Sequence, residues 1–175
     1  MQKGCTQLYY GDGKGKTTAA MGQIVRCVGH GFKVLVYQFL KEPNSGEVSI
    51  IRSLPGVDYI ENEGPIPFMF NLTPEQQEFY KEKFQKKFDE VREKYFTGNY
   101  DLVVLDEVNY AIHFGMLDTA EVAELIKARP ARLNMILTGR YAPQELIDLA
   151  DTVTEMTLVK HAFQKGIRAR KGIEF

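Results

Sequence analysis

The chain has 175 residues, of which 44% are hydrophobic, a length typical of one domain whose core needs no disulfide or metal. Its 22 basic and 23 acidic side chains leave a net charge of -1, which excludes an overall field that attracts nucleic acid or an anionic membrane. The sequence lacks a leader-like segment after Met1 and an apolar run of about eighteen residues, and its cysteines lack metal-ligand spacing. We therefore expect residues 1–175 to form one cytoplasmic domain, with Cys5 and Cys27 reduced.

The first expected strand, residues 8–10, leads directly into a glycine-rich stretch and then into a helical pattern. The stretch reads Gly11-Asp12-Gly13-Lys14-Gly15-Lys16-Thr17-Thr18. Glycines let the backbone curve round an anion with its N–H groups inward, and a helix N-terminus adds positive potential. Lys16 supplies a mobile charge and Thr17 a hydroxyl for Mg²⁺. The pattern predicts a phosphate-binding loop one residue shorter than the consensus, because Tyr10 stands where the first glycine is expected. The alternative, a flexible basic turn, leaves the helix unexplained.

Apolar runs typical of strands alternate with helix-like stretches along the whole chain. The runs cover residues 8–10, 34–39, 57–60, 102–105, 135–138 and 153–156. The runs at 34–37 and 102–105 lack polar alternation, as expected of central strands with helices on both faces. We therefore predict a three-layer α/β fold with a mostly parallel central sheet.

Two helices between these runs have recognisable N-termini. Residues 73–76 form a capping box with proline at the first helical position, and residues 118–121 begin another helix in the same way. After the first start, apolar residues follow at helical spacing: Tyr80, Phe84, Phe88, Val91 and Tyr95. We expect this stripe to lie in the core, and the mixed charges of residues 81–94 to form a solvated face.

Two acids, Asp106 and Glu107, follow the apolar run at 102–105. In open α/β sheets ligands bind at the carboxyl ends of strands, and a phosphate-bound Mg²⁺ needs oxygen ligands near Thr17. The pair alone does not distinguish a metal ligand from a general base that orients water. An acidic helix N-cap is the structural alternative.

These stretches together resemble the bacterial ATP:corrinoid adenosyltransferases of cobalamin synthesis over nearly the whole chain. The resemblance is carried by residues 11–20, 26–31, 36–41, 105–110, 137–140, 149–156 and 159–163. The shortened loop is that family's own form. The resemblance implies a RecA-like fold, a homodimer, and transfer of the 5′-deoxyadenosyl group of ATP to the cobalt(I) of a reduced corrinoid, with release of triphosphate. A flavoprotein is a candidate reductant.

The resemblance also implies that ATP lies reversed in the loop, with its γ-phosphate at the deep end and its ribose facing the corrin. The expected catalytic residues are Lys14, Lys16 and Glu107, because the departing triphosphate must be stabilised. Mg²⁺ is expected at Thr17 and Glu107, with Asp106 in support. The residues expected to bind ATP are Gly11, Asp12, Gly13, Lys14, Gly15, Lys16, Thr17, Thr18 and Arg26. No general base is needed, because the nucleophile is the metal of the substrate.

A proline-punctuated apolar segment at residues 65–70 is the expected wall for the corrin ring. We expect Phe68, Met69 and Phe70 to contact the corrinoid. The resemblance implies that an aromatic ring here displaces the lower axial ligand, and Phe68 and Phe70 are the candidates. Family members carry a tryptophan nearby, whereas this chain has none. Phenylalanines folded back onto the core are the alternative.

Two other functions fit the same motifs. A P-loop ATPase or small-molecule kinase would release ADP, and a non-catalytic nucleotide or corrinoid carrier would need only the loop. A zinc-containing thymidine kinase is disfavoured because paired cysteines are lacking. We expect His161 to be a structural residue, while the basic tail at residues 164–175 suits either anion binding or simple solvation.

Overall fold

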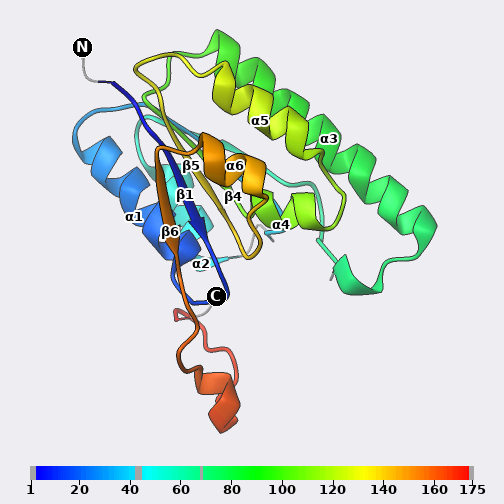
Figure 1. Ribbon diagram of the computed structural model, residues 1–175. Coiled ribbons are helices and arrows are strands. Elements are labelled where there is room, and N and C mark those ends of the chain that lie inside the picture. Colours follow the sequence, from blue (N-terminus) through cyan, green and yellow to red (C-terminus); the bar gives the residue numbers. More distant parts are fainter. Residues whose placement is uncertain (1–2, 42–44, 68, 174–175) are drawn as a thin grey trace.

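A computed structural model describes residues 3–41, 45–67 and 69–173 of the chain. Six parallel strands form one sheet in the order β3-β2-β4-β5-β1-β6 (Figure 1). The strands are β1 (Thr6–Tyr10), β2 (Val34–Gln38), β3 (Val57–Ile60), β4 (Leu102–Asp106), β5 (Asn134–Gly139) and β6 (Thr152–Glu155). All six predicted strands are present, and the predicted α/β fold with a parallel central sheet is confirmed.

Helices cover both faces of this sheet (Figure 1). They are α1 (Lys16–Gly29), α2 (Gly46–Ser53), α3 (Pro74–Thr97), α4 (Val108–His113), α5 (Thr119–Lys127) and α6 (Gln144–Leu149), with short 3₁₀ turns at Met69–Asn71 and Ala162–Lys165. Helices α1 and α2 pack on one face, and α3 to α6 pack on the other. Within the described ranges, no helix is long and apolar enough to cross a membrane.

The central strands β2 and β4 are buried on both faces, which explains their unbroken apolar sequence. Leu35 and Leu105 face α3 to α6, whereas Val34 and Val104 face α1 and α2. All four side chains are fully buried. Burying such a side chain stabilises a fold by about 1.5–3 kcal/mol, so this double coverage fixes the centre of the sheet.

The expected start of α3 is confirmed by a complete capping box. The Gln76 backbone N–H donates to the Thr73 hydroxyl, and the Thr73 N–H donates to the Gln76 side chain. The predicted aromatic stripe of α3 is buried from Phe84 to Tyr95. The prediction that α5 begins after Asp118 is confirmed, because the Asp118 side chain accepts from the Ala120 N–H. The predicted capping box does not form, because the Glu121 side chain accepts from Gln85 of α3. That contact ties the two helices together.

The strand order decides which loops meet at the carboxyl edge of the sheet. Strand β5 lies between β1, which carries the glycine-rich loop, and β4, which carries the two acids. Neighbouring strands lie about 4.8 Å apart, so the loop and the acids are separated by roughly 10 Å. The end of β5 therefore lies between the loop and the acids, while β2 flanks β4 on the other side.

Candidate functional site

The glycine-rich loop runs from the end of β1 into α1 and packs against the end of β6. The Gly13 N–H donates to the Met156 carbonyl at 2.6 Å, and a Cβ at Gly13 would lie 2.5 Å from that oxygen. Gly11 is equally crowded, and it has a φ of 106°. Gly15, the N-cap of α1, has a φ of 118°. Larger side chains would push the loop off β6 or strain it, so the glycines are needed for packing.

The side chain of Lys16 lies across this loop. Its Nζ donates to the carbonyl oxygens of Gly11 at 2.6 Å and Gly13 at 2.8 Å. Burial lowers the pKa of Lys16, and the carboxylate of Glu107 only partly offsets this. The lysine thus ties Gly11 to Gly13 across the loop and places its positive charge there.

Two further contacts hold the loop from outside. Arg140, at the end of β5, pairs with Asp12 at 3.1 Å. Lys14 Nζ donates to the Ile173 carbonyl at 3.0 Å, which brings the tail of the chain back to the loop. Gly172 and Ile173 line the same cavity as the loop. Residues 172–173 of the tail, whose role the sequence left open, therefore lie beside the glycine-rich loop.

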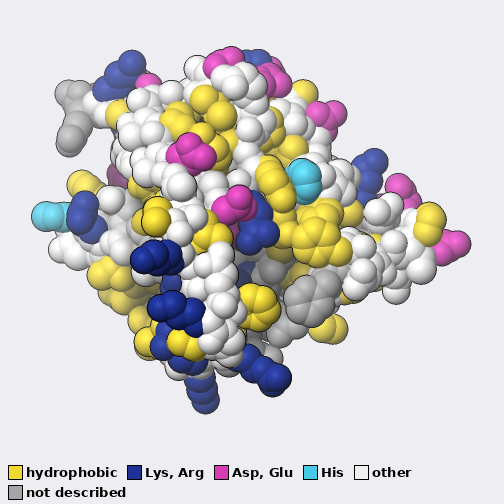
Figure 2. Space-filling model, turned by 60° about the horizontal axis from the view of Figure 1, so that its bottom comes forward, with side chains coloured by type: hydrophobic (Ala, Val, Ile, Leu, Met, Phe, Trp, Pro, Cys, Tyr) yellow, Lys and Arg dark blue, Asp and Glu magenta, His cyan; other side chains and the backbone are white. Residues whose placement is uncertain are grey.

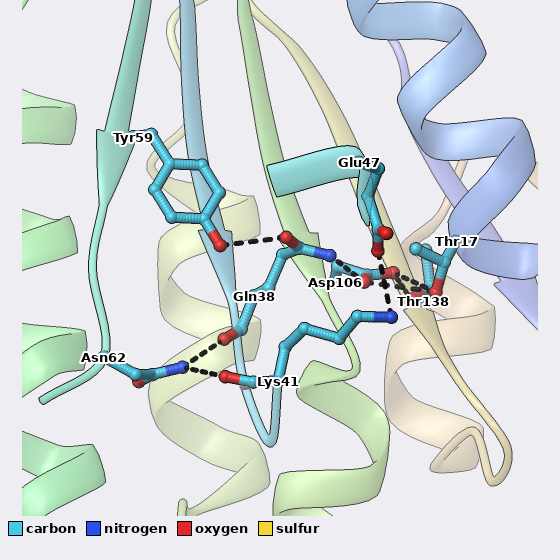
Figure 3. A network of polar contacts seen from close by, with 8 residues as sticks. All are labelled: Thr17, Gln38, Lys41, Glu47, Tyr59, Asn62, Asp106 and Thr138. Carbon is cyan, nitrogen blue, oxygen red and sulfur yellow. Dashed lines mark hydrogen bonds and ion pairs between the residues drawn. The ribbon is translucent and has the colours of Figure 1, made fainter. Parts of the chain in front are cut away.

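Asp106 is fully buried and is the centre of a network that joins four strands and a helix (Figure 3). Its Oδ1 accepts from the Thr138 hydroxyl of β5 at 2.6 Å, and its Oδ2 accepts from the Gln38 amide of β2 at 2.9 Å. The Thr17 hydroxyl of α1 lies 3.1 Å from both oxygens. Tyr59 of β3 donates to Gln38 at 2.9 Å. The buried charge is thus matched by three donors and holds Thr17 in place.

Sequence reasoning missed Gln38 and Thr138, although both are fully buried polar residues. A signal was available: each is the polar residue near the carboxyl end of an otherwise apolar strand. That is the edge where ligands of parallel sheets bind.

Glu107 occupies a different environment from its neighbour. Its backbone is left-handed, with a φ of 60°, and its N–H donates to Thr138 at 2.9 Å. The residue lines the cavity. Burial and the charge of Asp106 raise the pKa of Glu107 to about 7, against the attraction of Lys16. A carboxylate this costly to ionise suits a site that receives positive charge.

The cavity between these elements has a volume of about 550 Å³. Its lining combines residues 13–18 of the loop and α1 with Lys41, Glu47, Glu107 and the tail. The volume lies within the usual range for small-molecule sites. Most of the residues expected to bind the phosphates of ATP are thus brought together, and Lys41 and Glu47 are added to them.

Comparison with known proteins decides what kind of site this is. The model of the ATP:corrinoid adenosyltransferases BtuR/CobO/CobP matches residues 2–175. The chain belongs to the ATP:corrinoid adenosyltransferase family. Relatives named corrinoid adenosyltransferase include proteins of Pseudomonas aeruginosa, 40% identical over 99% of this chain and 85% of theirs, and Escherichia coli K12, 34% identical over 99% and 87%. The corrinoid adenosyltransferase CobA of Salmonella typhimurium is 36% identical, again over 99% and 87%. The resemblance seen in the sequence is confirmed, and the chain is a transferase.

Solved structures with a similar arrangement belong to a different kind of protein. EssC (ATPases 2 and 3) of Geobacillus thermodenitrificans superposes with a TM-score of 0.53 at 12% identity, and the cytoplasmic domain of EssC with 0.52 at 14%. The match covers 97% and 95% of the adenosyltransferase chain but only 35% of each EssC chain. At this identity the likeness shows the fold alone.

The adenosyltransferase site offers oxygen ligands that fit Mg²⁺. Within the part of the chain that the structure describes, no three His, Cys, Asp or Glu side chains gather into a metal cluster. Mg²⁺ does not need one, because it is commonly held by one or two carboxylates, phosphate oxygens and water. The Thr17 hydroxyl and the Glu107 carboxylate lie at the wall of the cavity, and the buried Asp106 accepts from Thr17 behind them.

The predicted nucleoside contact, Arg26, is not brought to this cavity. It is exposed in the last turn of α1, about 15 Å along the helix from Lys16 at 1.5 Å per residue. Its charge acts instead on Tyr9 of β1, whose pKa is raised by burial and lowered by Arg26. A role for Arg26 in binding ATP remains a prediction.

The segment at 65–70 divides into buried and exposed parts, while Phe68 lies outside the described residues. Met69 is buried in the core, but Phe70 is 67% exposed. The Phe70 ring packs edge-on against Phe114 at 5.0 Å and lies 6.3 Å from Tyr110, both in or next to α4. The alternative of phenylalanines folded onto the core thus does not describe Phe70.

An aromatic cluster that sequence reasoning missed extends from Phe70 across this edge of the sheet. It consists of Phe70, Tyr110, His113, Phe114 and Tyr141, and the His113 ring stacks on Tyr141 at 4.0 Å. Figure 2 shows hydrophobic side chains gathered on this face beside charged ones. Exposed apolar patches of this kind commonly mark binding sites. A signal for the cluster was the aromatic spacing of residues 110 and 114, one helical turn apart.

His161 has the structural role expected of it. Its Nδ1 accepts the Phe163 backbone N–H at 3.2 Å, and it caps the 3₁₀ turn at Ala162–Lys165. The Nδ1 of His161 is therefore used by the protein's own backbone.

Proposed function

We propose that this chain moves the 5′-deoxyadenosyl group of ATP to the cobalt(I) of a reduced corrinoid and releases triphosphate. Membership of the ATP:corrinoid adenosyltransferases over residues 2–175 is the observation that carries this proposal. The lining of the cavity supports it, because the glycine-rich loop and Glu107 line one space at the carboxyl edge of the sheet.

In this reaction the electron pair of the cobalt substrate forms a bond to the ribose C5′, and the C5′–O bond breaks. Its electrons leave with the triphosphate, whose growing charge must be stabilised. We assign this task to Lys16 and Lys14. Lys16 already lies in the loop, where the carbonyl oxygens of Gly11 and Gly13 hold it at 2.6 and 2.8 Å. Triphosphate oxygens would replace these carbonyls as its acceptors.

We assign the Mg²⁺ ligands to Thr17 and Glu107, with Asp106 as the residue that orients Thr17. The assignment rests on hydrogen bonding: both oxygens of Asp106 already accept from Thr17, Gln38 and Thr138, whereas Glu107 lines the cavity. Bound there, Mg²⁺ would neutralise part of the triphosphate charge. The loop residues 11–18 then hold the phosphates, with the ribose turned toward the corrin.

We place the corrin ring against residues 68–70 and the aromatic cluster next to them. Phe70 suits a role in displacing the lower axial ligand, because it is exposed and its described ring contacts are edge-on. By likeness to the family we also propose a homodimer in the cytoplasm and a flavoprotein as the source of electrons.

The phosphorus product tests this function against the alternative of a P-loop ATPase or kinase. The protein is incubated with MgATP and a chemically reduced corrinoid in the dark without oxygen, and the products are read by phosphorus NMR and by absorbance. We expect triphosphate together with a light-sensitive carbon–cobalt bond. Formation of ADP and an unchanged corrinoid would refute the proposal.

A further inference from the structure

Lys41 and Glu47 line the same cavity as the phosphate-binding loop. Lys41 follows β2, and Glu47 lies in the first turn of α2. Their side chains are 25% and 27% exposed, and the Lys41 Nζ lies 2.9 Å from a Glu47 oxygen. Figure 3 shows the Lys41 side chain extended toward the side where Thr17 and Asp106 lie. Lys41 also lowers the pKa of Glu107 by its charge, which places its ammonium near the catalytic acids.

The backbone before Lys41 is held in an uncommon conformation. Leu40 has a φ of 51°, in the left-handed region that side chains other than glycine seldom adopt. Asn62 fixes this turn, because its Nδ2 donates to the carbonyl oxygens of Gln38 at 2.8 Å and Lys41 at 3.1 Å. Tyr37 in turn donates to the Asn62 Oδ1 at 2.8 Å. Strain that surrounding contacts maintain tends to occur where a side chain must be aimed at a ligand.

The charge of Glu47 is unexpected in a cavity built for a polyanion. Burial would raise the pKa of Glu47, but the hydrogen bond and the charge of Lys41 outweigh it and hold that pKa below its usual value. Glu47 is therefore ionised and would repel a triphosphate. Its pairing with Lys41 neutralises both groups while the cavity is free of anions, and a triphosphate competes with it for Lys41.

We propose that Lys41 is a third cation for the triphosphate, alongside Lys14 and Lys16, and that Glu47 holds it in place until the nucleotide binds. The proposal rests on the function proposed above. On binding, the Lys41 ammonium exchanges the Glu47 carboxylate for a phosphate oxygen. Glu47 thus sets the affinity for the nucleotide, and Lys41 stabilises the leaving group.

The sign of two substitutions tests the proposal. The dissociation constants of MgATP and of sodium triphosphate are measured by calorimetry for Lys41→Gln, Lys41→Arg and Glu47→Gln, without any corrinoid. We expect Lys41→Gln to weaken binding about tenfold, the loss of one charge-assisted hydrogen bond. Glu47→Gln should tighten binding about threefold, because it frees Lys41 and removes a repulsion, and Lys41→Arg should restore most of the affinity.

A structural ion pair predicts another pattern: Lys41→Gln and Glu47→Gln would then act in the same direction, because each breaks the same contact. In the double variant the gain from Glu47→Gln should shrink, because it depends on Lys41. Lys94→Gln is the matched control, since Lys94 pairs with Asp58 at 3.0 Å outside the cavity. Thermal unfolding establishes that each variant is folded.

Turnover adds a second readout. We expect kcat to fall in Lys41→Gln together with the affinity for MgATP, because the triphosphate gains negative charge as it departs. Equal signs for the two single variants, or unchanged binding in both, would overturn the proposal. Release of ADP by the wild-type protein would refute the adenosyl transfer instead, so the two failures are distinguishable.

Discussion

The carboxylate of Asp106 and the ring of Phe70 lie at the same edge of the sheet but in opposite surroundings. Asp106 is fully buried and accepts from donors on three elements. Phe70 is 67% exposed, and its described ring contacts are edge-on. The side with Asp106 is thus held in place by the protein's own hydrogen bonds, as the proposed stabilisation of a leaving group requires. The aromatic side can rearrange round a large apolar ligand at little cost.

The largest effect is expected where the fixed side meets the triphosphate. Lys16→Ala removes the charge in the mouth of the loop, and we expect turnover to fall about 1,000-fold, as when a preorganised donor is lost. Phosphorus NMR of the released triphosphate measures it. Lys127→Ala, in an exposed ion pair on α5, is the control and should leave turnover unchanged. Turnover near the wild-type level in Lys16→Ala would show that Lys16 does not stabilise the departing triphosphate.

The next effect concerns pH and the buried acid beside the loop. The pKa of Glu107 is about 7 in the folded protein and 4.5 as the unperturbed value, so the folded state binds its proton more tightly. This tighter binding of the proton adds up to about 3 kcal/mol to the free energy of unfolding. The contribution is complete below pH 4.5 and is lost as the pH rises through 7. Denaturant unfolding at several pH values should therefore show a decline that Glu107→Gln removes. The same decline in that variant would contradict the assignment to Glu107.

A smaller loss of stability is expected at the bridge between the loop and the acids. Thr138→Val keeps the shape of the side chain but leaves the Asp106 Oδ1 and the Glu107 N–H without this partner. We expect the free energy of unfolding to fall by about 1–3 kcal/mol, the cost of a buried unpaired polar group. Thr152→Val, on the exposed edge strand β6, is the control. A melting temperature unchanged in Thr138→Val would show that the bridge is not structural.

The smallest effect on stability is expected on the adaptable side. Phe70→Ala should change the free energy of unfolding by less than about 0.5 kcal/mol, since the ring is largely exposed. The KM for the corrinoid should nevertheless rise severalfold, while the affinity for ATP stays the same. Phe79→Ala is matched, because Phe79 is 61% exposed on α3. Equal KM values in both variants would remove Phe70 from the corrinoid site.

The sequence by itself determined several features that depend on local spacing. The glycine-rich loop, the capping box at Thr73 and the apolar runs of β2 and β4 each follow from residues near in the chain, whose periodicity reports burial directly. The family also followed from the sequence, because the shortened loop and the acids after β4 are contiguous motifs. Asp106 and Glu107 were found in this way, but their adjacent positions say nothing about which of them is buried.

Only the tertiary structure decided how these parts meet. The strand order placed β5 and β2 on the two sides of β4. It therefore made Thr138 of β5 and Gln38 of β2 the partners of Asp106. The fold also put Lys41 and Glu47 in the same cavity as the loop, and it left Arg26 at the far end of α1. These contacts join residues far apart in the chain. The apolar pattern did not fix the strand order, because more than one order satisfies the same burial pattern.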